Sequence, residues 1–221
     1  MRTLNDPSLM QTRAYVNGVW VAGKKTFPVE NPATGEVIAH VADLSAEDVA
    51  MAIDAAHAAK RAWARADVKT RSNTLRKLFD LMVENADDLA TILTMEMGKP
   101  WAEARGEILY GASYIEWFAE EAKRIYGDMI PGPQNDKRMV IVKQPVGVVG
   151  AITPWNFPNA MLARKMAPAL AVGCTMVARP SEFTPLSALA LAVLAERAGV
   201  PAGVFNVLPG LDASGMGQEL C

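Results

Sequence analysis

The segment from Pro145 to Glu182 constrains the fold of this chain more than any other stretch of its sequence. It begins with an apolar run, VGVVGAI, which is typical of a parallel strand buried on both faces. The sequence TPWNFP follows, and its two prolines prevent both a longer strand and an immediate helix. From Asn159 to Gly173 apolar residues recur near the helical period, and a second apolar run, CTMVA, leads to Arg179. This order predicts a strand, a helix and a second, parallel strand.

The turns that follow these two strands are the first candidates for a binding site, because open α/β sheets bind ligands at the carboxyl ends of their strands. Asn156, in the first turn, would be held rigidly, and its amide could donate a hydrogen bond to an oxyanion. In the second turn, Arg179 and Glu182 could bond to ribose hydroxyls, as the acidic residue of dinucleotide-binding folds does. The commoner uses of such residues, a turn-forming Asn and a solvated ion pair, remain open alternatives.

The rest of the sequence predicts short strands and long amphipathic helices whose apolar stripes form the core. Residues 15–21 alternate around Asn17-Gly18, which is a strong signal for a hairpin. Ser45 and Asp48 have the spacing of a capping box at the start of a helix. The other expected elements are strands within 27–41, helices at 69–95 and 101–126, a polar crossover at 127–138, a strand at 139–143, a helix at 186–197, a third parallel strand at 204–208 and a last segment at 212–220.

Charge and residue usage exclude several classes of function. The formal charge of −2 gives no electrostatic reason to expect nucleic acid or an anionic membrane as a partner. No apolar run has transmembrane length and the first residues hold no signal sequence, so we expect a cytoplasmic protein. The two cysteines, Cys174 and Cys221, do not suggest a disulfide framework. His40 and His57, the two histidines, have no partner at the spacing of metal ligands, so no metal site is expected.

Several motifs together resemble those of the aldehyde dehydrogenase superfamily, in that family's usual order and over essentially the whole chain. They are YVNGVWV, NPATGEVIAHV, EMGKP, TPWNFP, PALAVGCT followed by a basic residue and Pro-Ser-Glu, and GVPAGVFNVLPG. Within the family, IEWFAEEAKRIYGD and NAMLARK are most similar to the succinate-semialdehyde dehydrogenases. The resemblance implies an incomplete aldehyde dehydrogenase fold, of the α/β class.

That fold would place N-terminal strands and a three-helix region of the cofactor-binding domain at residues 1–138. A strand of a small oligomerisation sheet would lie at 139–145, with the first strands contributing to the same sheet. The first half of a Rossmann-like, parallel-sheet NAD(P)-binding domain would lie at 146–221, and the catalytic domain would be absent. The resemblance also implies a homo-oligomer, a dimer or tetramer, as the complete enzyme.

The cofactor site cannot be predicted from the usual glycine fingerprint, because the nearest match, Gly147 and Gly150, lies inside the first strand. The resemblance implies that the cofactor binds without that loop. NAD is the expected cofactor, because Glu182 would repel a 2′-phosphate, and NADP remains open because Arg179 stands where the family commonly has Lys and favours phosphate contacts. The implied cofactor-binding residues are Ile152, Thr153, Pro154, Trp155 and Asn156 beside the nicotinamide, and Arg179, Ser181 and Glu182 at the adenosine ribose.

Two further residues receive roles from the resemblance. Asn156 would be a catalytic residue that donates a hydrogen bond to the oxyanion. Arg164 would bind the carboxylate of the substrate, a task for which the forked guanidinium is suited. The alternative for Arg164 is an exposed basic pair with Lys165 on an amphipathic helix.

The implied reaction is the NAD(P)-dependent oxidation of an aldehyde, succinate semialdehyde to succinate, through a thiohemiacetal and a thioester on a cysteine. Neither Cys174 nor Cys221 matches that nucleophile, which the resemblance places beyond this chain, so we expect these 221 residues alone to be inactive. The alternative is a truncated, inactive relative that binds nucleotide or a partner subunit. An unrelated dehydrogenase is disfavoured, because the sequence offers no other catalytic constellation.

Overall fold

A five-stranded sheet lies at the centre of the computed structural model, which describes residues 3–221. Its strand order is β2-β1-β9-β8-β7, and β7, β8 and β9 run parallel, whereas β1 pairs antiparallel with both β2 and β9. The predicted order of strand, helix and parallel strand is therefore confirmed. The strands are β1 (Ala14–Val16), β2 (Val19–Val21), β7 (Val148–Ile152), β8 (Thr175–Arg179) and β9 (Phe205–Val207).

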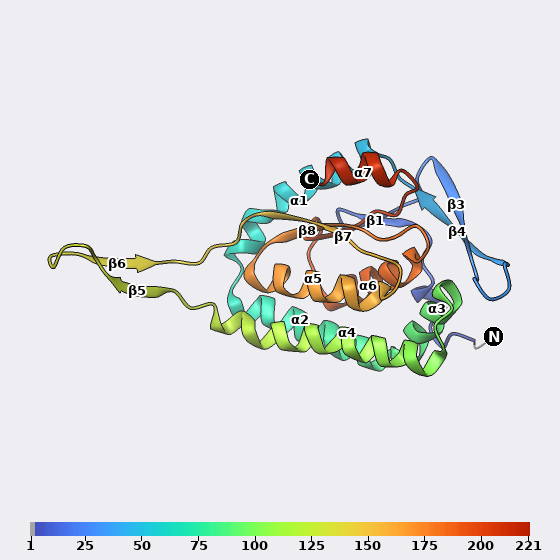
Figure 1. Ribbon diagram of the computed structural model, residues 1–221, viewed down its shortest axis with the longest axis horizontal. Helices are drawn as coiled ribbons and strands as arrows, with labels where there is room; N and C mark the ends of the chain where they lie inside the picture. The colour runs from blue at the N-terminus through green and yellow to red at the C-terminus, as the bar shows by residue number, and fades with distance from the viewer. Residues whose placement is uncertain (1–2) are drawn as a thin grey trace.

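Helices cover the sheet in three layers (Figure 1). One face packs against α1 (Ala46–Arg65), with α7 (Ala213–Glu219) beside it, and the other face against α5 (Pro158–Val172) and α6 (Pro185–Ala198). An outer layer then covers α5 and α6. It consists of α2 (Val68–Glu84), α3 (Ala86–Met97) and α4 (Trp101–Glu121), followed by the short helix η2 (Ala122–Arg124). The first described element is another short helix, η1 (Pro7–Leu9).

The apolar stripes expected to form the core are buried between these layers. Each side chain that packs there removes apolar surface from water, which is the main force that holds the layers together. The stripe residues that are almost fully buried are Val49, Ala56, Trp63, Leu75, Leu78, Met82, Leu89, Ile92, Leu93, Ile108, Ile115 and Ala122.

Two local motifs have the predicted geometry. Asn17 and Gly18 both have positive φ, 50° and 77°, as the two-residue turn between β1 and β2 requires. At the start of α1, the Ser45 hydroxyl accepts a hydrogen bond from the Asp48 amide, and the Asp48 carboxylate accepts one from the Ser45 amide (2.8 Å). The predicted hairpin and capping box are thus confirmed.

Two expectations for the main elements are wrong. Residues 69–95 form two helices, because Asn85 leaves the helical conformation and donates its side-chain amide to the Leu81 carbonyl (2.8 Å). β7 is not buried on both faces: it is the edge strand of the sheet, and its last residue, Ile152, is 47% exposed.

The third correction concerns the small sheets. The predicted crossover at 127–138 contains a strand, β5 (Asp128–Pro131), which pairs antiparallel with β6 (Arg138–Ile141). This hairpin projects from the body of the molecule (Figure 1). The first strands do not join it, because β1 and β2 extend the central sheet, whereas β3 (Lys25–Glu30) and β4 (Val37–Asp43) form a separate pair. Within residues 3–221, none of the helices is long and apolar enough to cross a membrane.

Candidate functional site

The turn between β7 and α5 begins where the sheet ends. The Thr153 amide donates to the Arg179 carbonyl (3.1 Å), so the start of this turn is bonded to the last residue of β8. Pro158 occupies the first turn of α5, where the absence of its amide hydrogen costs nothing. Between them Trp155, Asn156 and Phe157 are exposed.

Asn156 combines a fixed main chain with a free side chain. Its carbonyl accepts a hydrogen bond from the Lys99 ammonium (3.1 Å). Its side-chain amide, by contrast, makes no hydrogen bond with any of residues 3–221 and lies at the surface. The amide is therefore available to donate to a bound molecule, at the carboxyl edge where open α/β sheets bind their ligands.

The turn that follows β8 holds the second group of predicted residues. Arg179 is only 5% exposed, and its Nη2 donates to Glu182 Oε2 (3.1 Å) and to the Gly210 carbonyl (3.0 Å). Ser181 is buried too, and its hydroxyl accepts from the Phe183 amide (3.3 Å). The pair of Arg179 and Glu182 is thus mostly buried rather than solvated, and it links the turns after β8 and β9.

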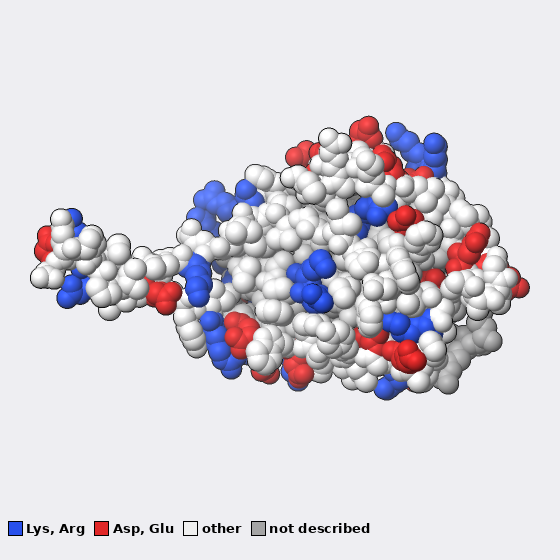
Figure 2. Space-filling model, in the orientation of Figure 1, with Lys and Arg blue, Asp and Glu red and all other residues white. Residues whose placement is uncertain are grey.

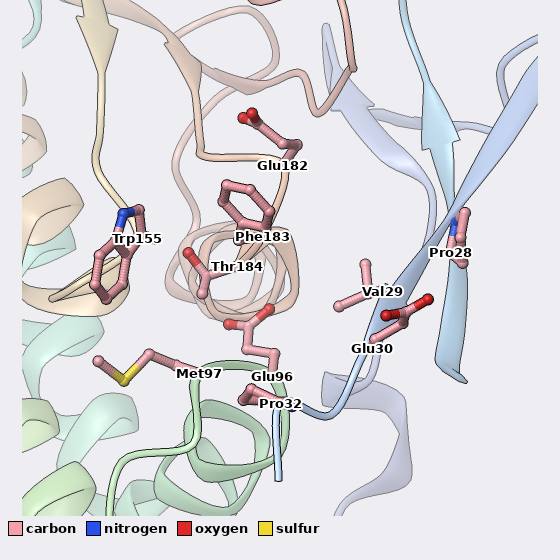
Figure 3. Close-up of a pocket in the computed structure, with 10 residues that line it drawn as sticks. All are labelled: Pro28, Val29, Glu30, Pro32, Glu96, Met97, Trp155, Glu182, Phe183 and Thr184. Carbon is pink, nitrogen blue, oxygen red and sulfur yellow. The ribbon is translucent and has the colours of Figure 1, made fainter. Parts of the chain in front are cut away.

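Glu182 keeps one acceptor free. Its Oε1 makes no hydrogen bond within the described part of the chain, and its side chain is 30% exposed. The residue borders a pocket of about 660 Å³ (Figure 3), which also contacts Trp155 from the first turn and Glu96 from the end of α3. The structure therefore brings residues of both predicted turns to one open pocket.

Two buried carboxylates that the sequence analysis did not single out cap the helices leaving these turns. Glu107 Oε1, on α4, accepts from the amides of Asn159 (3.1 Å) and Ala160 (3.3 Å) at the start of α5. Glu96 accepts from the amides of Leu186 (2.7 Å) and Ser187 (2.8 Å) at the start of α6. Neither helix receives a hydrogen bond from the side chain of its own N-cap residue, so the outer layer provides the capping.

Arg164 lies on the exposed side of α5. Figure 2 shows basic side chains over α5 surrounded by uncharged surface, and Arg164 and Lys165 are the two basic residues of that helix. Arg164 makes no ion pair with any described residue. Its charge also acts on α4: a hydrogen bond with Tyr110 raises the pKa of Tyr114, and the positive charge of Arg164 opposes that rise.

Neither cysteine lies beside Asn156 as a nucleophile would. Cys174 is buried immediately before β8, at the opposite end of the sheet from the two turns, and Cys221 is the exposed last residue. Across residues 3–221, no group of three His, Cys, Asp or Glu side chains is arranged to hold a metal ion.

Comparison with known proteins identifies the family to which this fold and these turns belong. Residues 20–221 match the model of the aldehyde dehydrogenase family. The chain belongs to that family. A crystal structure of an aldehyde dehydrogenase from Brucella melitensis biovar abortus superposes with a TM-score of 0.96 at 56% identity, over 99% of this chain and 46% of that one. The predicted family and fold are confirmed.

Two curated aldehyde dehydrogenases illustrate the likeness. The glutarate-semialdehyde dehydrogenase of Pseudomonas aeruginosa is 58% identical over 98% of this chain. The NADP(+) succinate-semialdehyde dehydrogenase of Escherichia coli is 56% identical over the same share. This chain spans 45% of the length of each of them.

Members of this family use NAD(P), and the residues present fit part of such a cofactor. Glu182 Oε1 can accept from a ribose hydroxyl, and the Nε of Arg179 is buried without a partner among the described residues. The pyrophosphate has no place at the first turns of α5 or α6, because Glu107 and Glu96 already occupy the amides that would bind it. Arg179 and Glu182 therefore fit a ribose, whereas the N-termini of α5 and α6 do not fit a phosphate.

The burial of Glu96 makes the stability of this aldehyde dehydrogenase chain depend on pH. Desolvation raises the pKa of Glu96 from 4.5 to about 8, against the hydrogen bonds from Ser187 and Leu186. Between these two pH values the unfolded chain has lost a proton that the folded chain retains. The free energy of unfolding therefore contains a contribution that is full at low pH and falls as the pH rises through this window.

Glu96→Gln removes the titration but keeps an oxygen that can accept one of the two amides. We expect the difference in free energy of unfolding between Glu96→Gln and the unmodified chain to shift in favour of the variant from about pH 5 to pH 8. Urea unfolding at several pH values measures this difference. Glu84→Gln, an exposed glutamate on α2, is the control and should show no such shift. If the difference in free energy of unfolding between Glu96→Gln and the unmodified chain does not change with pH, Glu96 is ionised over the whole range from about pH 5 to pH 8.

Proposed function

We propose that this chain forms the cofactor-binding part of an NAD(P)-dependent enzyme that oxidises succinate semialdehyde to succinate. The observation that carries the proposal is the turn after β7, where the Asn156 side-chain amide makes no hydrogen bond with the described residues while its main-chain carbonyl accepts from Lys99. The aldehyde would be attacked by a cysteine thiolate that belongs to the part of the enzyme outside these 221 residues.

Asn156 acts on the oxygen of the aldehyde. Addition of the thiolate converts the carbonyl oxygen into an alkoxide, and a rigid amide N–H that donates to this oxygen stabilises its charge. Loss of hydride from the same carbon re-forms the carbonyl as a thioester, and water then releases the carboxylic acid and the thiol. The nicotinamide supplies the acceptor for the hydride. Ile152, Thr153, Pro154 and Trp155 would form the wall beside the nicotinamide.

Arg164 selects an aldehyde that carries an acid at its other end. The residue is exposed and forms no ion pair with residues 3–221. It lies on the helix that follows the turn, six residues after Pro158, which is about 9 Å along the helix axis. The names of the two curated relatives describe dehydrogenases for glutarate and succinate semialdehyde, which both have a carboxylate opposite the aldehyde. A guanidinium can bind that carboxylate through two parallel hydrogen bonds.

NAD is the proposed cofactor. Glu182, beside the buried Arg179 and Ser181, would accept from the ribose hydroxyls and would repel a 2′-phosphate. NADP is the second candidate, because the relative from Escherichia coli is named as an NADP(+) enzyme at 56% identity. Assays of the complete enzyme with each cofactor distinguish the two.

Asn156→Ala in the complete enzyme that contains this chain should lower kcat by roughly a hundredfold or more, because one donor to the alkoxide is lost. Steady-state oxidation of succinate semialdehyde measures the loss. Asn73→Ala, which removes an exposed side-chain amide from α2, is the matched control and should leave kcat unchanged. Unchanged turnover for Asn156→Ala would contradict its role, and a complete protein without aldehyde oxidation would overturn the proposed function.

Arg164→Ala should raise the KM for succinate semialdehyde by roughly ten- to a hundredfold, because a charged hydrogen bond is lost. The KM for butanal, which has the same number of carbons and no carboxylate, should change little. Arg61→Ala on α1, an exposed arginine on the opposite face of the sheet, is the control. An equal increase in KM for both aldehydes would mean that Arg164 does not bind the carboxylate of the substrate.

The hairpin of β5 and β6 supports a homo-oligomer. The residues of both strands are exposed, and Met129 and Val140, which lie opposite each other across the two strands, are more than 70% exposed. We expect Met129→Lys with Val140→Lys to reduce the molar mass of the complete enzyme in solution, measured by light scattering, because charged residues would have to be desolvated at the interface. Val19→Lys, at an exposed position on β2, should leave the mass unchanged. An intact oligomer in the hairpin variant would exclude this surface.

A further inference from the structure

Lys99 connects the loop between α3 and α4 to the turn that carries Asn156. Gly98, with φ of 80°, ends α3 and turns the chain so that Lys99 points toward the sheet. The Lys99 ammonium donates to Glu107 Oε2 (2.5 Å) and to the Asn156 carbonyl (3.1 Å). It also lies 3.8 Å from the centre of the Phe157 ring, within the range of a cation–π interaction.

Glu107 holds the other end of the same turn. Its Oε1 accepts from the amides of Asn159 and Ala160, while its Oε2 accepts from Lys99. The side chains of Lys99 and Glu107 are only 10% and 1% exposed. One buried ion pair therefore binds the main chain on both sides of Pro158. Glu107 binds the amides that follow it, and Lys99 binds the Asn156 carbonyl that precedes it.

The carbonyl contact bears on the direction of the Asn156 side chain. The carbonyl carbon is bonded to the same Cα that carries the side chain, so a fixed carbonyl sets the direction in which the Cα–Cβ bond leaves the main chain and from which the amide extends. The amide itself has no hydrogen-bond partner among the described residues, so no hydrogen bond within this part of the chain orients it directly. Preorganised donors are effective because no reorganisation is needed when charge develops.

We propose that Lys99 and Glu107 are positioning residues for Asn156: their ion pair holds the turn so that the amide points at the developing alkoxide. This inference rests on the proposed role of Asn156. It assigns a task to the Lys of the EMGKP motif and to a buried acid on α4.

The test uses the complete enzyme and the double variant Lys99→Met with Glu107→Gln. Removal of both charges leaves no unpaired buried ion, and the Gln oxygen can still accept from the amides of α5, so the fold should persist. We expect kcat to fall by roughly tenfold or more while KM for the aldehyde and the cofactor stays within about twofold. Asp87→Asn with Arg105→Met is the matched control, because it removes an exposed ion pair between α3 and α4 and should leave kcat unchanged.

A double-mutant cycle with Asn156→Ala separates positioning from a general structural role. If Lys99 and Glu107 act through Asn156, their substitution should change kcat by less than about twofold once Asn156 is already Ala. Equal losses in both backgrounds, or an unchanged kcat in the double variant alone, would overturn the inference while leaving the role of Asn156 intact. An unchanged kcat for Asn156→Ala alone would instead overturn the proposed role of Asn156.

Discussion

Two buried carboxyl groups fix the outer helical layer to the starts of α5 and α6, the helices that pack on the sheet. The first amides of any helix lack partners within the helix, and in α5 and α6 these amides donate to Glu107 and Glu96 instead. Because each helix follows a turn of the candidate site, a carboxylate from the outer layer fixes both the helix and the turn before it. The position of Asn156 and Glu182 therefore depends on how α3 and α4 pack.

The three turns at the carboxyl edge of the sheet are also bonded to one another. Thr153 in the first turn donates to the carbonyl of Arg179, and the Arg179 guanidinium donates to the carbonyl of Gly210 beyond β9. Such cross-turn hydrogen bonds let short loops hold a defined shape without further secondary structure. The site is thus one connected unit, in which the exposed amide of Asn156 and the free oxygen of Glu182 are the parts left for a ligand.

Local chemistry made the central unit predictable. Pro158 and Gly173 determine where α5 begins and ends whatever surrounds them, and the motifs around them identified the family. The roles of Glu96 and Glu107 were not predictable, because which acid meets which helix end depends on the docking of distant helices. The hint available was that Phe157, before α5, cannot cap a helix with its side chain. β5 could not be predicted for a different reason. Both faces of this hairpin are exposed, so its sequence does not need the alternation of apolar and polar residues that marks a strand with one buried face.

The contact between Arg179 and Glu182 has a consequence for changing the cofactor preference of such an enzyme. The obvious way to admit a 2′-phosphate is to neutralise Glu182, which removes the repulsion. Here the same substitution would remove the carboxylate partner of Arg179, a residue that is 5% exposed. Within residues 3–221, the Gly210 carbonyl would then be the one hydrogen-bond partner left to this buried charge. If Glu182 has its proposed role, the same side chain serves both cofactor specificity and the structure of the turn, so Arg179 and Glu182 would have to be redesigned together.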